Sequence, residues 1–263
     1  METRRTENEG RDEMESFESF DGVRIAYEEI GQGDATLLHH GFASDSRINW
    51  VRPGVARAIA DAGRRVVLID ARGHGRSEKP HGVEAYLGGA MERDVRALLD
   101  RLEIEEVAMV GYSMGSFVAI RLAVSDPRVR SLVLGGTGSA PASTSSLEQS
   151  ESIAEALEAD DKSAIRDPKA LAFRNFAEAT GADRLALAAI QRARCEPPGE
   201  ESFRAITVPT LVVNGERDAL LGPLDSLVEA MPQAELKLVP GNHTSVVVKP
   251  EFRQAIVEFL SKN

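Results

Sequence analysis

Runs of consecutive apolar residues recur along the chain, separated by segments in which apolar residues return every three or four positions. The runs do not alternate with polar residues, which is typical of strands covered on both faces in a parallel sheet. They lie at Thr36–His39, Val66–Ile69, Val107–Val110, Ser131–Leu134, Thr210–Val213 and Leu236–Val239. The segments between them predict amphipathic helices, for instance over Met91–Leu102 and Phe252–Leu260. Strand and helix alternate, so we predict a doubly wound, mostly parallel α/β sheet.

A β-hairpin is predicted where the folded part of the chain begins. The segments Phe17–Phe20 and Val23–Glu28 flank Asp21-Gly22, and Asp-Gly between two strands is a strong signal for a tight turn. We expect this hairpin to form the antiparallel edge of an eight-stranded sheet. Residues 1–16 are almost wholly polar and lack the apolar segment of a secretory signal, so they are predicted to be a flexible acidic leader.

The alternation of strand and helix stops between Gly135 and Ile206. A run rich in Ser, Thr, Ala and Pro opens this segment at 137–146, and a disordered insert would fit that run alone. Helical spacing follows at Leu147–Ala159, Pro168–Thr180, Asp183–Arg194 and, as a short turn, Glu201–Ile206. A structureless loop of this length would be unusual in a compact domain. We therefore predict a helical cap, 137–206, over the carboxyl-end edge of a core formed by 17–136 and 207–263.

Composition narrows the classes of partner. The chain has 263 residues, a net charge of −11 and a pI near 5.1, which argues against nucleic acid and anionic membrane surfaces. No apolar run approaches the ~18 residues that a membrane span needs. The single cysteine, Cys195, excludes an intramolecular disulfide and a cysteine-based zinc site. It is compatible with a reducing compartment, and we expect a cytoplasmic protein without metal or cofactor.

The segment Gly111–Gly115 has the form G-x-S-x-G. It lies between the strand predicted at Val107–Val110 and a helical run at Ser116–Ala123. A strand, a sharp turn and a helix in this order are typical of a nucleophile elbow, in which the hydroxyl is exposed at a strained apex. Ser113 is therefore the candidate nucleophile.

A serine hydroxyl needs a general base, and the base needs an orienting carboxylate. In proteins with such an elbow the acid and then the histidine follow the serine in the chain. Only one of the five histidines, His243, follows Ser113. It lies in a turn-rich loop after the last predicted strand. Asp218 directly follows the strand Thr210–Val213 and is the favoured acid, with Glu216 as its competitor.

Acyl transfer also requires donors for a developing oxyanion. The backbone N–H of Met114, directly after the nucleophile, is one candidate. The second is expected in the loop that follows the strand Thr36–His39, where we choose the N–H of Phe42. Gly41 would let the backbone approach the substrate.

With these motifs the chain resembles the α/β-hydrolase superfamily, in the lid-bearing branch of serine esterases and C–C bond hydrolases. The resemblance rests on His40-Gly41-Phe42, Asp70–Ser77, Gly111–Gly115 and the pair of Asp218 and His243. It implies that Arg72, His74 and Ser77 are scaffold residues. Haloalkane dehalogenases and epoxide hydrolases of this fold carry an aspartate at the elbow, so the serine disfavours both activities.

The expected function is hydrolysis of a small ester, thioester or lactone through an acyl-enzyme. A C–C bond hydrolase, an amidase or a perhydrolase could use the same triad, and a ligand-binding or signalling protein on this scaffold is an alternative of another class. Trp50, Phe173 and Phe176, together with Phe42 and Met114, are the candidate walls of the substrate pocket. The sequence does not predict the substrate or the oligomeric state.

Overall fold

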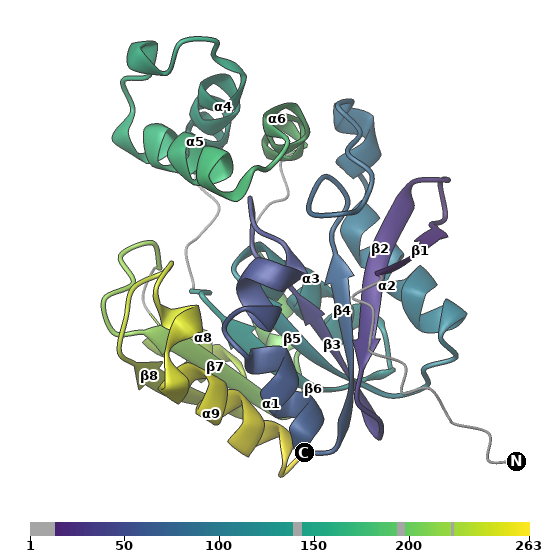
Figure 1. Ribbon diagram of the computed structural model, residues 1–263. Helices are drawn as coiled ribbons and strands as arrows, with labels where there is room; N and C mark the ends of the chain where they lie inside the picture. Colours follow the sequence, from purple (N-terminus) through teal and green to yellow (C-terminus); the bar gives the residue numbers. More distant parts are fainter. Residues whose placement is uncertain (1–13, 139–143, 194–197, 222–223) are drawn as a thin grey trace, which may run out of the picture.

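The computed structural model describes residues 14–138, 144–193, 198–221 and 224–263. Its centre is an eight-stranded sheet in the order β1-β2-β4-β3-β5-β6-β7-β8, in which β1, β2 and β4 pair antiparallel and all later pairs are parallel (Figure 1). The strands are β1 Glu15–Glu18, β2 Arg24–Ile30, β3 Asp34–His39, β4 Arg64–Asp70, β5 Val107–Tyr112, β6 Val129–Gly135, β7 Thr210–Gly215 and β8 Ala234–Val239. This confirms the predicted α/β sheet with an antiparallel hairpin at its edge.

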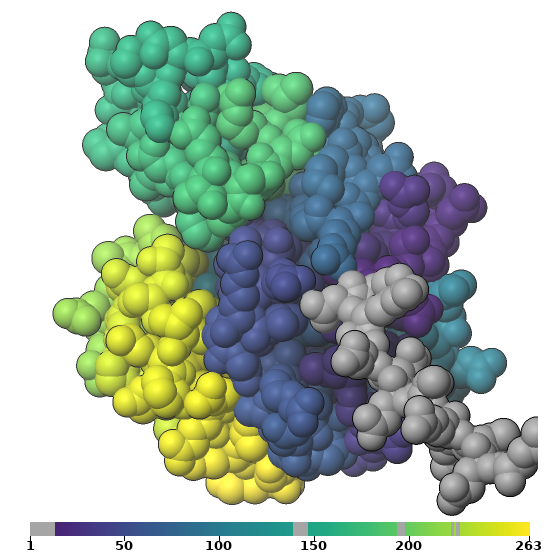
Figure 2. Space-filling model, in the orientation of Figure 1, coloured from purple at the N-terminus to yellow at the C-terminus, as the bar shows by residue number. Residues whose placement is uncertain are grey.

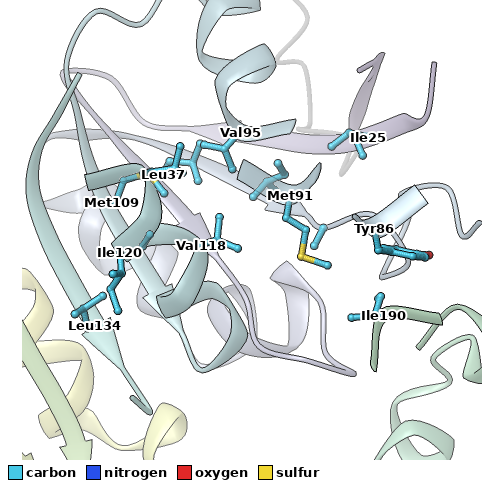
Figure 3. Close-up of a cluster of buried hydrophobic side chains, with 14 of the residues drawn as sticks. Ile25, Leu37, Tyr86, Met91, Val95, Met109, Val118, Ile120, Leu134 and Ile190 are labelled. Carbon is cyan, nitrogen blue, oxygen red and sulfur yellow. The ribbon is translucent and has the colours of Figure 1, made fainter. Parts of the chain in front are cut away.

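Helices cover both faces of the sheet, as the continuous apolar strands predict (Figure 1). On one face lie α1 (Val55–Asp61) and α9 (Pro250–Leu260), and on the other α2 (Ala90–Arg101) and α3 (Met114–Ser125). Successive residues of β5 point to opposite faces of the sheet. Met109 packs in the core on the α2/α3 face, and Val110 packs in the core on the α1/α9 face. Figure 3 shows the α2/α3 core, with Val95 and Val118 facing the strands.

Two details of the predicted sheet are wrong. Strand β1 begins at Glu15, inside the range predicted as leader, because Glu15 and Ser16 pair with Tyr27 and Ala26 of β2. Strand β8 is an edge strand and is not covered on both faces; Leu236 and Leu238 remain 36% and 49% exposed. The rest of the predicted leader, residues 1–13, lies outside the described residues.

The cap consists of α4 (Thr144–Glu158), α5 (Pro168–Thr180) and α6 (Arg184–Arg192), all close to the helices predicted from spacing. The short α7 (Glu200–Arg204), which lies in the range predicted as cap, packs instead against α3 and α8 (Asp225–Ala230) of the core. Local signals explain the boundaries. Asp167 and Asp183 cap the first turns of α5 and α6 through backbone N–H groups, and Gly181 ends α5 with a φ of 71°. Helix α4 starts within the run rich in Ser, Thr, Ala and Pro at 137–146, of which 139–143 lie outside the described residues. Cys195 also lies outside them.

The cap lies over the carboxyl ends of the parallel strands (Figure 1). Ile190 of α6 belongs to the main core and lies beside Tyr86 (Figure 3). The hydroxyl of Thr180, the last residue of α5, donates to the carbonyl oxygen of Ala43 at 2.8 Å. The cap is thus tied to the loop that follows β3. In the part of the chain that the structure describes, no helix combines the length and the apolar character needed to cross a bilayer.

Candidate active site

Ser113 lies at the turn between β5 and α3 with a φ of 52° and a ψ of −111°. A non-glycine residue with a positive φ is strained by about 1–3 kcal/mol and persists only where its surroundings impose the conformation. Here the N–H of Ser113 donates to the carbonyl of Gly135 on the neighbouring strand β6 at 2.8 Å. The serine is half-buried, and α3 starts at the next residue.

Close backbone contacts explain both glycines of the G-x-S-x-G segment. A Cβ on Gly111 would lie 2.4 Å from the carbonyl oxygen of Gly115, across the turn. A Cβ on Gly115 would lie 2.1 Å from the carbonyl oxygen of His39, at the end of β3. Both distances are far below any real contact, so a side chain at either position would force the strand and helix apart. The spacing of the motif therefore follows from the packing of β3, β5 and α3.

The structure brings Ser113, His243 and Asp218 together. The Nε2 atom of His243 lies 3.1 Å from the Oγ atom of Ser113, and its Nδ1 atom lies 2.7 Å from an Oδ atom of Asp218. The Asp218 side chain is fully buried, whereas the His243 side chain is 19% exposed toward the cavity. Glu216, the competing acid, is exposed and makes no such contact.

The two contacts of His243 define the state of its ring. A carboxylate oxygen accepts, so Nδ1 carries the proton and Nε2 presents its lone pair to the serine hydroxyl. Tyr112 adds a contact that the sequence did not predict. Its hydroxyl donates to the backbone carbonyl of His243, and its ring centroid lies 5.4 Å from the imidazole. Burial raises the pKa of Tyr112 far above its usual range, so it remains a neutral donor.

The loop after β3 is held by two buried histidines. His40 accepts from the N–H of Ala71 at 3.0 Å and donates to the carbonyl of Gly41 at 2.8 Å. His74 accepts from the N–H of Ala43 at 3.2 Å and donates to the carbonyl of Arg72. Each ring therefore has one donor and one acceptor nitrogen and is neutral. Burial, followed by the neighbouring buried imidazole of His40, lowers the pKa of His74 well below its usual value.

The Gly41 N–H donates to the side-chain oxygen of Asn49 at 2.8 Å, and the Ala43 N–H is taken by His74. Within the described residues, the intervening N–H of Phe42 has no acceptor. Its neighbour Gly41 lies against the elbow, because a Cβ there would be 3.5 Å from the Cβ of Ser113. The N–H of Met114 begins α3 on the other side of the serine. These two donors remain the predicted pair.

Arg72 and Ser77 of the Asp70–Ser77 motif are also buried and paired. Arg72 is fully buried between the carboxylates of Asp94 and Asp21, at 2.6 Å and 2.8 Å. Ser77 accepts from the N–H of Ala26 on β2 and donates to the carbonyl of Asp70. These contacts join the hairpin, β4 and α2, which is the arrangement a scaffold role requires.

A cavity of about 210 Å³ opens above Ser113 between the cap and the core. Its walls are mostly apolar and include three of the candidate wall residues, Phe42, Phe173 and Phe176; the rings of Phe42 and Phe173 meet edge to face at 5.8 Å. The segments that line it meet at a notch between the green cap, the dark-blue loop and the yellow C-terminal part in Figure 2. Its polar lining comes from Ser44, Asn49, Ser113, Lys169, His243 and Thr244.

Two predicted wall residues lie elsewhere. Trp50 is completely buried in the core between the sheet, α1 and α9, where its ring packs edge to face against Tyr112 at 6.4 Å. The turn Arg47–Val51 places Asn49 and Ile48 at the cavity and rotates Trp50 away from it. The side chain of Met114 lies in a smaller neighbouring cavity with Phe117. Trp50 is therefore a core residue.

A doubly wound sheet with a strained serine between strand and helix defines an α/β enzyme of the hydrolase type. Residues 35–187, more than half of the chain, match the family described as alpha/beta hydrolase fold. The protein therefore belongs to the α/β-hydrolase family.

Relatives with similar sequences or structures carry hydrolase names. Over 252 residues the chain is 29% identical to a putative carbamate hydrolase, RutD, of Variovorax paradoxus, covering 88% of this chain and 92% of that protein. The structure of a thermophilic esterase from Thermogutta terrifontis with malate bound is 25% identical with a TM-score of 0.79, covering 95% and 98%. Bifunctional epoxide hydrolase 2 of Sus scrofa is 33% identical over 112 residues, which span 42% of this chain and 20% of that protein. The chain is thus an enzyme of this family.

Proposed function

We propose that this enzyme is a serine hydrolase that cleaves a small ester, thioester or lactone through an acyl-enzyme. The observation that carries the proposal is the continuous hydrogen-bond chain from Asp218 through His243 to Ser113, at the floor of an apolar cavity. The cavity, at about 210 Å³, is smaller than the ~300–1,000 Å³ typical of sites for drug-sized ligands. A short acyl or alcohol group fits this size.

In the first half-reaction, Ser113 Oγ attacks the substrate carbonyl carbon while its proton passes to His243 Nε2. Asp218 stabilises the resulting imidazolium, and the N–H groups of Phe42 and Met114 stabilise the oxyanion by on the order of 3 kcal/mol each. His243 then returns the proton to the leaving group. Water, deprotonated by His243, releases the acyl group in the second half-reaction.

Ester cleavage is favoured over the other activities of relatives. Epoxide opening is disfavoured because the elbow carries a serine in place of aspartate, even though one relative is an epoxide hydrolase. C–C bond cleavage, amide cleavage and perhydrolysis would use the same three residues, so the difference lies in the cavity and the leaving group. An acyl series of activated esters separates them, because uniformly feeble rates would favour a C–C bond or amide substrate.

The proposal is tested with p-nitrophenyl esters of increasing acyl length and with a fluorophosphonate label. The wild type is expected to give a burst of nitrophenol and to be labelled at Ser113. Ser113→Ala is expected to lose turnover by on the order of 10⁴-fold or more and to lose the label. Ser125→Ala, at the exposed far end of the same helix α3, is the matched control and keeps both. Equal, slow rates for wild type and Ser113→Ala would reject the proposal.

A further inference from the structure

Lys169 is the one residue with a permanently charged side chain among the described residues that line the cavity above Ser113. It lies in the first turn of α5, in the part of the cap that faces the active site. Among the residues that the structure describes, no carboxylate lines the cavity, and Asp218 is buried behind His243. The lining therefore combines mostly apolar walls with one cationic side chain.

The ammonium group of Lys169 has no hydrogen-bond or ion-pair partner in the part of the chain that the structure describes. Its nearest acid in sequence, Asp167, is occupied by the side chains of Gln149 and Ser152 and by the Lys169 backbone N–H. Lys162 of the same cap differs, because its ammonium group pairs with Glu178 at 2.7 Å. The charge of Lys169 is thus available to a ligand.

The surroundings make this one cation significant. The chain carries a net charge of −11, which repels anionic substrates in general. An unpaired cation beside apolar walls offsets this repulsion locally, and its attraction strengthens as the substrate displaces water from the cavity. An uncharged substrate would gain little from the ammonium group.

We propose that the preferred substrate is an ester or lactone with a carboxylate at the end of its acyl chain, and that Lys169 binds this carboxylate. The acyl chain would then lie along Phe173 and Phe176 while its carbonyl carbon reaches Ser113. This inference rests on the proposed serine-hydrolase function and adds the substrate class.

Two esters of equal acyl length test the inference: p-nitrophenyl pentanoate and mono-p-nitrophenyl glutarate. Wild type is expected to prefer the glutarate. In Lys169→Gln, kcat/KM for the glutarate is expected to fall roughly fivefold, and in Lys169→Glu by more than tenfold, with pentanoate changed less than about twofold. Lys169→Arg restores the preference, and added salt weakens it in wild type. The matched control, Lys162→Gln, removes the same charge outside the cavity and leaves the preference intact.

An unchanged glutarate-to-pentanoate ratio in Lys169→Gln overturns the inference, as does an equal loss in Lys162→Gln. If wild type hydrolyses neither ester, the proposed serine-hydrolase function fails. The role of Lys169 is then tested by the binding of two unreactive methyl esters, which needs no turnover. Calorimetry on Ser113→Ala is expected to show tighter binding of monomethyl glutarate than of methyl pentanoate, with the difference lost in Ser113→Ala/Lys169→Gln. Equal binding of the two esters, or no binding of either, overturns it.

Discussion

Replacing Gly115 by alanine tests whether packing, rather than the serine turn alone, requires glycine at the end of the elbow motif. The new Cβ would lie 2.1 Å from the carbonyl oxygen of His39 and 2.8 Å from that of His40. Both are backbone atoms where β3 passes into the loop of Phe42. Unlike the end of a flexible side chain, they cannot move without moving the strand.

The expected change in the free energy of unfolding of Gly115→Ala follows from two opposing effects. An ordinary contact begins at 3.4 Å, so β3 and α3 must separate by roughly 1 Å. Forcing an extra methyl group into a packed interior costs about 1–3 kcal/mol, and the rigid backbone here places Gly115 at the upper end. Alanine has a helix propensity about 1 kcal/mol more favourable than that of glycine, which offsets part of this cost. We therefore expect a loss of about 2 kcal/mol in the free energy of unfolding.

Urea unfolding followed by circular dichroism measures this loss, and ester turnover reports the displacement of the Phe42 loop. The matched control is Gly199→Ala, where φ is −83° and no atom of the described residues lies within 4 Å of the new Cβ. The control is expected to unfold as wild type does. If Gly115→Ala stayed within about 0.5 kcal/mol of wild type and kept full activity, packing would not explain this glycine.

Two further predictions concern charge and protonation. Asp218→Asn is expected to lower kcat by on the order of 10³–10⁴-fold, because an amide no longer fixes the His243 tautomer, while Glu216→Gln leaves kcat unchanged; equal losses in steady-state assays would contradict the assignment. Burial, followed by the neighbouring imidazole of His40, lowers the pKa of His39 to about 3, so the native state binds fewer protons than the unfolded state below the ordinary value of ~6.5. This stabilisation is complete above pH ~6.5 and is lost as the pH falls toward 3, by about 2 kcal/mol at pH 5. The free energy of unfolding, measured between pH 7 and pH 4, should fall more steeply with decreasing pH for wild type than for His39→Gln. An equal pH dependence in the two proteins would refute this role of His39.

Most of the fold could be predicted from the sequence alone because the signals that determine its helices and strands are local. Apolar runs, helical spacing, the Asp21-Gly22 turn and the capping residues Asp167 and Asp183 each act over a few residues, and the helices and strands they predict are present. Chain order then selected Ser113, His243 and Asp218 as candidates. Their juxtaposition follows once parallel strands place their carboxyl ends at one edge of the sheet.

Only the tertiary structure decided which residues surround these three. Periodicity shows that Trp50 and Leu238 are apolar, but not that one fills the core beside Tyr112 and the other lies on an edge strand. The bond from Tyr112 to the His243 carbonyl and the opening of Lys169 into the cavity join segments more than fifty residues apart. Such contacts depend on strand order and on how the cap is seated, which no local pattern encodes. The residues that meet in the candidate active site could therefore be proposed from the sequence, whereas the shape and charge of the cavity could not.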